Sequence, residues 1–408
     1  MKKYLIIITI ICLLSGIASA QQTISLQSAI DTALNNNLSV RNEKLYSEYQ
    51  EKLKAAAVDI PQTNLIGEFG QFNSAFSDNN FGIAQSISFP TVYAKQKSLQ
   101  NENYKTSVLH IALREAEIKK QVSTVFYQII FLNEKQQILM EVDSIYAAFL
   151  EKANLRFDKG ESNILEKTTA ETQRGQIAIQ LKQIQQDIEI LQMQFQLLLN
   201  TTTVYLPSAN NPKMNFIAST DTSLLNNHPS LQLLEQEKNV AIVNTQLQKS
   251  KLLPDLQLAY NNMSQQGMGA DDILYPKSER FSSVQFGIGI PLFFGAQKAN
   301  IDAAKSLELI SENNFQLGQQ SLKSEYASAF KKYEIQLATV KYFEETALRN
   351  ADIISETAHQ QFENGDINYL EWTMLINNAI SIQSNYLDAV NELNQSVIQL
   401  NYLINGKL

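Results

Sequence analysis

Apolar and polar residues alternate with a period of two in two separate parts of the chain. In the clearest example every second residue is apolar and the residues between are small or polar; the apolar ones are Val284, Phe286, Ile288 and Ile290. Residues 81–89 and 256–260 alternate in the same way, with Gln85 as the exception, whereas residues 62–76 alternate poorly. Because a period of two places successive side chains on opposite faces of a strand, we predict two β-hairpins, at about 62–90 and 255–291, and thus four strands.

The other long segments have helical periodicity. Apolar residues recur every seven positions along one of them: Ile111, Ile118, Val125, Leu132, Leu139, Tyr146 and Ala153. A second seam at Val122, Ile129, Leu150 and Phe157 is interrupted by Gln136 and Asp143. Sustained heptads predict coiled-coil packing. The stretch from Thr91 to Asp158 would form a helix about 100 Å long, and segments 25–60 and 163–200 would each form helices of roughly half that length.

The chain repeats itself with a period near half its length, which indicates an internal duplication. In the best match, Phe, Gly, Asn, Leu and Glu recur at identical spacing in residues 156–166 and 361–371. We therefore predict a first structural repeat at 21–200, a linker at 201–221 and a second repeat at 222–408. Each repeat would consist of a helix, a β-hairpin, a long helix and a further helix.

The first 20 residues have the pattern of a secretory signal peptide. Lys2 and Lys3 precede an apolar core at 5–14, and Ala18-Ser19-Ala20 forms a small-residue cleavage site. The only cysteine, Cys12, lies within this segment, so the mature chain would contain no thiol or disulfide. No later segment approaches 18 consecutive apolar residues, and we expect no transmembrane helix.

Composition and motif content argue against several classes of function. Only 14 glycines and 8 prolines occur in 408 residues, which favours long uninterrupted helices. A net charge of -8 makes nucleic-acid binding a poor fit. His110, His228 and His359 lie far apart and lack zinc-site spacing, and no nucleophile–base pattern is present. We expect no catalytic residues, no metal site and no cofactor.

Strands with one apolar and one small or polar face suit the wall of a membrane β-barrel. Val284, Phe286, Ile288 and Ile290 would then face lipid, and the helices would continue the barrel as a tunnel. Four strands cannot close a spanning barrel, because closure requires at least about eight, so several chains would share one. The alternative is a secreted coiled-coil structural or adhesion protein in which the hairpins form a small soluble β-domain.

This layout resembles the TolC-like outer-membrane efflux family. The resemblance depends on the duplicated layout, on Phe157-x-x-Gly160 and Phe362-x-x-Gly365, and on the strand that ends at residues 288–293. The family usually has an aromatic residue, often Tyr, at the two Phe positions. The resemblance implies a homotrimer with a shared twelve-stranded barrel in the outer membrane and a helical tunnel in the periplasm. It also implies a periplasmic adaptor and an inner-membrane pump as partners, and passive export of small molecules or metal ions.

The resemblance places the two aromatic-x-x-Gly segments at helix turns where the tunnel narrows at its periplasmic tip. Glu166 and Glu371 would face this constriction, with Asp366 adding negative charge, and three chains would form a carboxylate ring that selects cations. Asn163-x-x-Glu166 and Asn368-x-x-Glu371 also have the spacing of a helix capping box. The gate and the cap are compatible roles, and both remain open at this point.

Two further expectations concern packing at the turns. Gly160 and Gly365 would permit left-handed turns between helices. Trp372, the only tryptophan, would pack between the turn helices.

Overall fold

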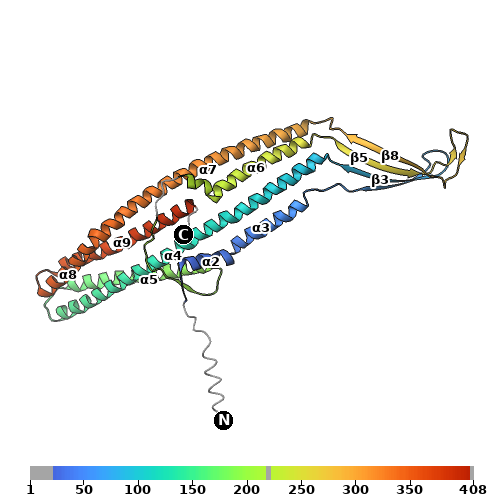
Figure 1. Cartoon of the computed structure of the whole chain (residues 1–408). Helices are drawn as coiled ribbons and strands as arrows, with labels where there is room; N and C mark the ends of the chain where they lie inside the picture. Colours follow the sequence, from blue (N-terminus) through green and yellow to red (C-terminus); the bar gives the residue numbers. More distant parts are fainter. Residues whose placement is uncertain (1–21, 217–221, 405–408) are drawn as a thin grey trace, which may run out of the picture. The chain divides into compact units, whose positions relative to one another are not determined.

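A computed structural model describes residues 22–216 and 222–404, and most of these residues are helical (Figure 1). The predicted signal peptide lies outside the described residues. The helical elements are α2 (Leu26–Asn36), α3 (Leu38–Ala55), α4 (Pro90–Asp158), α5 (Ile164–Leu199), the short 3-10 helix η1 (Thr222–Asn227), α6 (Pro229–Ser250), α7 (Gly295–Tyr342), the π-helix η2 (Phe343–Ala347), α8 (Leu348–Asn364) and α9 (Tyr369–Leu403). The strands are β1 (Gln22–Ile24), β2 (Asn64–Gly70), β3 (Asp78–Ile87), β4 (Tyr205–Pro207), β5 (Asp255–Met263), β6 (Gly267–Met268), β7 (Leu274–Tyr275) and β8 (Phe281–Gly289).

The described chain divides into two compact units. Residues 43–111 and 230–319 form the first, which we call the hairpin unit because it contains β2, β3, β5 and β8. The second, which we call the turn unit, contains residues 22–42, 112–216, 222–229 and 320–404. Among the residues that the structure describes, no helix has the length and apolarity that a membrane span requires.

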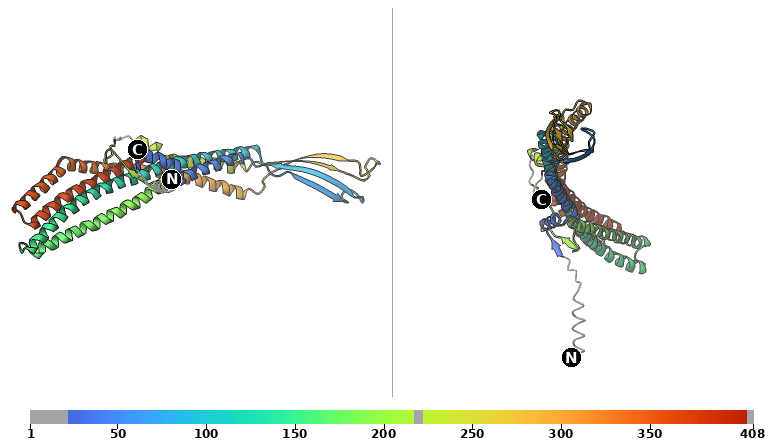
Figure 2. Two further views of the ribbon diagram at one scale, coloured as in Figure 1. Left: turned by 90° about the horizontal axis from the view of Figure 1, so that it is seen from below. Right: turned by 90° about the vertical axis from the view of Figure 1, so that its right-hand side faces the viewer.

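The hairpin unit contains one antiparallel four-stranded sheet in the order β2-β3-β5-β8. Strands β2 and β3 lie within the first predicted hairpin, and β5 and β8 lie within the second. The two hairpins run side by side because β3 pairs with β5 (Figure 2). Two very short strands, β6 and β7, pair with each other in the connection between β5 and β8.

Cross-strand register gives the sheet two chemically different faces. Directly opposed residues share a face, and one row across all four strands is apolar: Leu65, Ile83, Tyr260 and Val284. The rows beside it on the same face place Leu258 opposite Phe286 and Leu256 opposite Ile288. On the other face, the matching row consists of Asn64, Ala84, Ala259 and Gln285. In these rows the period of two produces one apolar and one small or polar face, whereas further along the strands Asn262 and Ser282 fall on the first face and Ile66 on the second.

Gln85 is the one polar side chain in the apolar rows, and local hydrogen bonds explain how it is accommodated. Its Nε2 donates to the carbonyl of Pro61 at 2.8 Å, and its Oε1 accepts from the hydroxyl of Thr63 at 2.6 Å. An amide whose donor and acceptor are both satisfied is far less costly to place on an apolar surface than a free one.

Coiled-coil packing in the turn unit follows the predicted seam only in part. Leu139, Tyr146 and Ala153 are buried as predicted. The second seam differs, because Val142 and Phe149 are buried in place of the predicted positions 143 and 150. An α-helix has 3.6 residues per turn and drifts relative to a strict seven-residue repeat. This drift explains why Gln136 and Asp143 interrupt the heptad.

Three local features of the turn unit have no counterpart in the predicted layout. The first short helix breaks at Asn37, whose extended backbone ends α2 and whose Nδ2 donates to the carbonyl of Leu198 at 2.9 Å. The linker contains β4, which pairs in parallel with β1. The second long helix is interrupted by η2, where Glu344 accepts from Lys213 at 2.7 Å and from the hydroxyl of Tyr386 at 3.2 Å.

Candidate functional site

The candidate site lies where two helix–helix turns meet at one end of the turn unit. One turn joins α4 to α5 and the other joins α8 to α9, and both lie at the same end in two views (Figures 1 and 2). Lys152 of α4 forms an ion pair with Glu363 of α8, with its Nζ 3.3 Å from Oε1. The structure thus brings together the two segments that the sequence repeat equates.

Both turns end their first helix with the same backbone motif. Gly160 and Gly365 have left-handed backbones, with φ of 71° and 78°. The amide of Glu161 donates to the carbonyl of Arg156, and the amide of Asp366 donates to that of Gln361, each at 2.8 Å. This six-to-one bond past a left-handed glycine is the Schellman ending, in which a side chain with a Cβ would be strained. The geometry agrees with the left-handed turns expected at both glycines.

Both turns start their second helix with an asparagine cap. Asn163 Oδ1 accepts from the amides of Leu165 and Glu166, at 3.0 and 3.2 Å. Asn368 Oδ1 accepts from the amides of Leu370 and Glu371, at 2.9 and 3.0 Å. These bonds satisfy two of the amides that every helix start leaves without an intrahelical partner.

The two glutamates of the repeat have different surroundings. Glu371 is exposed, and its carboxylate accepts from the amide of Asn368 at 3.0 Å, which completes a capping box. Glu166 is 4% exposed, and its Oε1 lies 3.1 Å from Nη1 of Arg156. The position that corresponds to Arg156 in the second turn is Gln361, which carries no charge to draw Glu371 away from its cap.

The two aromatic residues of the repeat also differ in their partners. Lys167 Nζ lies 5.4 Å from the ring centre of Phe157. Trp372 occupies the position equivalent to Lys167, and its ring centre lies 5.3 Å from that of Phe362. Phe149 of α4 contacts both rings, with centres 4.7 Å from Trp372 and 5.9 Å from Phe362. The second turn therefore has an aromatic cluster that the first turn lacks.

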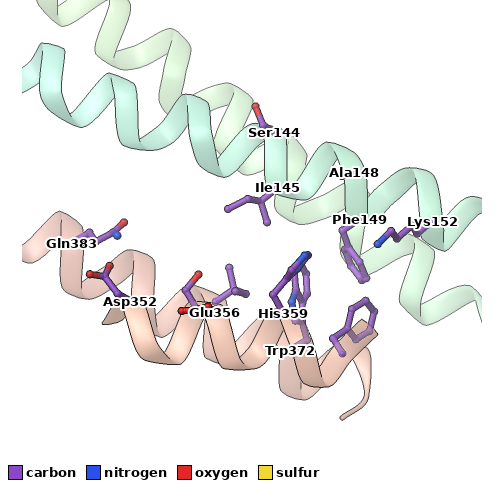
Figure 3. A pocket seen from close by; sticks show the side chains of 13 residues that line it. Ser144, Ile145, Ala148, Phe149, Lys152, Asp352, Glu356, His359, Trp372 and Gln383 are labelled. Carbon is purple, nitrogen blue, oxygen red and sulfur yellow. The ribbon is translucent and has the colours of Figure 1, made fainter. Parts of the chain in front are cut away.

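This aromatic cluster forms one end of a pocket of about 620 Å³ between α4 and the α8–α9 pair. Figure 3 shows its lining side chains approaching from the facing helices. The expectation that Trp372 packs between the turn helices agrees with its 3% exposure. The pocket itself was not predicted, since it depends on Phe149, which lies one position away from the predicted seam.

The remaining predicted residues are found in two places. Asp366 is exposed in the α8–α9 turn. Val284, Phe286 and Ile288 are 72%, 70% and 55% exposed on the apolar face of the sheet. Ile290 is also exposed but follows the last residue of β8.

Histidines and carboxylates do not assemble into a metal site in the described residues, where no group of three or more potential ligands is found. His228 is buried, and burial lowers its pKa to about 4, so it is neutral at physiological pH. His359 is exposed beside Glu363, with 3.5 Å between Nε2 and Oε1.

Comparisons with known proteins agree with this geometry. Residues 222–406 match the family model described as outer membrane efflux protein. Among curated protein sequences, none matches the chain. Solved structures with the same fold include CusC, with a TM-score of 0.78 and 18% identity, covering 95% of this chain and 94% of that one. The CmeC outer membrane channel of Campylobacter jejuni has a TM-score of 0.79 and 13% identity, covering 93% and 85%. The outer membrane protein VceC of Vibrio cholerae has a TM-score of 0.76 and 13% identity, covering 93% and 96%.

Long helices, paired hairpins and duplicated helix turns define the fold as that of the TolC-like outer-membrane channels. Residues 222–406, which cover nearly all of the second predicted repeat, are similar to the outer membrane efflux protein family.

The asparagine caps lead to a stability prediction. Replacing Asn368 with Ala removes the acceptor for two helix-start amides and should lower the free energy of unfolding by about 1 kcal/mol. Urea titration followed by far-UV circular dichroism measures this change. Asn378→Ala, an exposed substitution within the same helix, is the matched control and should be neutral or slightly stabilising. Equal effects at the two positions would contradict the capping role.

Proposed function

We propose that the protein is the outer-membrane channel subunit of a tripartite export system. It acts as a passive duct for small molecules or metal ions and has no catalytic role. Transport is driven by an inner-membrane pump, to which a periplasmic adaptor connects the duct. Three copies share one barrel, which continues as a helical tunnel in the periplasm.

The open four-stranded sheet is the observation that carries this proposal. Strands β2 and β8 are its outer strands, and each pairs on one side only. In a bilayer, an unpaired row of backbone amides and carbonyls has no water to bind, so spanning sheets must close. Three copies of four strands give twelve, which is above the minimum of about eight. The similarity of residues 222–406 to the outer membrane efflux protein family supports the same conclusion.

The exposed apolar face favours this proposal over a soluble β-domain in a structural or adhesion protein. Leu65, Val284 and Phe286 are each at least 70% exposed on that face. A soluble domain would bury such a surface, whereas a barrel presents it to lipid. The opposite face, with Asn64, Gln285 and small residues, suits a wet lumen.

The oligomeric state tests the shared barrel directly. Protein purified in detergent from outer membranes should have the mass of three chains by native mass spectrometry and should dissociate on heating. A folded monomer that resists dilution in detergent would overturn the proposal, because four strands alone leave both sheet edges open.

Charge placed on the two faces of β8 should have different effects. Phe286→Arg would put a cation on the lipid side and should destabilise the assembled barrel by about 2 to 4 kcal/mol near the bilayer midplane. Gln285→Arg, at the adjacent position of the same strand, should be tolerated because its side chain faces water. Heat-dissociation midpoints in detergent and yields of assembled protein in outer membranes measure both variants. Comparable damage from the two would reverse or remove the assignment of faces.

We further propose that the α8–α9 turn contributes a cation-selective constriction at the periplasmic tip, in which Phe157, Gly160, Phe362 and Gly365 shape the two turns. Glu371 and Asp366 are exposed there, so three chains would bring several carboxylates around one axis. Glu166 contributes less, since it is buried and paired with Arg156. The sequence predicts equal roles for the two glutamates, whereas we now propose that Glu371 has the larger one.

Single-channel recording distinguishes the gate from a purely structural cap. Glu371→Gln retains a capping side chain but should shift the reversal potential in a salt gradient towards lower cation preference. The matched variant removes both partners of the buried ion pair, Arg156→Gln with Glu166→Gln, and should have the smaller effect because the net charge of that turn does not change. An unchanged reversal potential in Glu371→Gln would leave this residue as a helix cap alone.

A further inference from the structure

The pocket between α4 and the α8–α9 pair has features of a small-molecule site. Its volume of about 620 Å³ lies within the range of roughly 300 to 1,000 Å³ that is usual for ligand pockets. All of its lining residues belong to the turn unit. The site is therefore complete within one compact part of a single chain.

The apolar part of the pocket is closely packed. Phe149 and Trp372 are each 3% exposed and pack against each other and against Phe362. Tyr146, one turn earlier on α4, contacts Trp372 and donates to Oδ1 of Asn377 on α9 at 2.8 Å. This hydrogen bond ties α9 to α4 behind the pocket, so the aromatic surface is preorganised for an apolar group.

The polar part of the pocket carries uncompensated negative charge. Asp352 and Glu356 are exposed, one helical turn apart on α8, and neither forms an ion pair within the described residues. The two basic groups of the lining, Lys152 and His359, both lie beside Glu363, at 3.3 and 3.5 Å. Within the part of the chain that the structure describes, the α8 side of the pocket therefore carries two unpaired carboxylates next to the aromatic cluster (Figure 3).

We propose that this pocket binds an amphipathic organic cation: an amine, pyridinium or quaternary ammonium ion that carries an apolar group. The apolar group lies against Ile145, Phe149 and Trp372, and the positive charge faces Asp352 and Glu356. An inorganic cation fits less well, because the described residues offer no group of three metal-binding side chains. An organic anion is disfavoured by the two carboxylates. Binding at this pocket does not depend on the proposed duct, so the two can fail separately.

The sequence provides its own reporter for the test. Trp372 is the only tryptophan of the chain, so fluorescence excited at a wavelength that tyrosine does not absorb reports from the pocket alone. The full-length assembled protein in a non-ionic detergent is titrated with 1-benzylpyridinium. Its benzyl group should lie against Trp372, which holds the pyridinium ring, a quencher of indole fluorescence, one methylene group away. Isothermal titration calorimetry gives the affinity independently. The neutral comparison ligand is 4-benzylpyridine in mildly alkaline buffer, which has nearly the same size and no charge.

The expected result is saturable quenching by 1-benzylpyridinium and clearly weaker binding of 4-benzylpyridine. The double variant Asp352→Asn with Glu356→Gln removes two exposed charges from the rim and should raise the Kd about fivefold. The matched control, Glu171→Gln with Asp187→Asn, removes two exposed carboxylates from α5 outside the pocket and should leave the Kd unchanged.

Three outcomes would overturn the proposal. The first is linear, non-saturating quenching with no heat of binding. The second is equal affinity for the cation and its neutral analogue, which would indicate a site for apolar molecules in general. The third is an equal loss of affinity in the rim variant and the α5 control, which would indicate attraction to the overall charge of the protein.

Discussion

Backbone hydrogen bonding at the two edges of the sheet is the constraint on which the rest of the structure depends. Inside the sheet, β3 and β5 pair on both sides, whereas β2 and β8 pair on one side only. In water such edges can be hydrated, but in a bilayer each unpaired group costs several kcal/mol. A chain that places its apolar sheet face in lipid must therefore satisfy β2 and β8 with neighbouring copies. In the proposed shared barrel, membrane insertion and oligomerisation would then be two consequences of the same requirement.

Residue periodicity predicts much of the fold, because it reflects contacts repeated along whole elements. Alternation at 284–290 predicts the face on which Phe286 and Ile288 lie, and the cross-strand register agrees. Heptads predict a long helix at 91–158, and α4 extends from Pro90 to Asp158. The repeated Phe-x-x-Gly predicts left-handed glycines, since only glycine adopts that backbone without strain. Each of these patterns involves residues that are close together in the sequence, and each occurs more than once along the chain.

Features that depend on single contacts between distant residues were not predictable in this way. The break at Asn37 involves Leu198, and the π-helix places Glu344 beside Lys213 and Tyr386. The burial of Phe149 depends on how far the helix has drifted from its heptad where it meets α9. The pocket at the second turn depends in turn on Phe149. A periodic pattern carries no information about single contacts between residues that are far apart in the sequence.

The two turns have the same backbone conformation but different chemistry, because the repeats differ at two equivalent positions. Where the first turn has Arg156 and Lys167, the second has Gln361 and Trp372. The first pair supplies positive charge, which buries Glu166 in an ion pair and places an ammonium beside Phe157. The second pair supplies none, so Glu371 stays exposed in its capping box and Phe362 packs on an indole ring.

The identical glycine endings and asparagine caps explain why this divergence is tolerated. None of the four divergent side chains takes part in the Schellman bonds past Gly160 and Gly365 or in the caps at Asn163 and Asn368. Arg156 and Gln361 contribute only their backbone carbonyls. The turn geometry is therefore held independently of the charge that surrounds it. In a symmetrical assembly, turns of the first kind would be nearly neutral at their glutamate, and turns of the second kind would present negative charge beside an aromatic pocket. If the proposed constriction is correct, change at a few turn positions of the repeat would be sufficient to confine cation recognition to the α8–α9 turn.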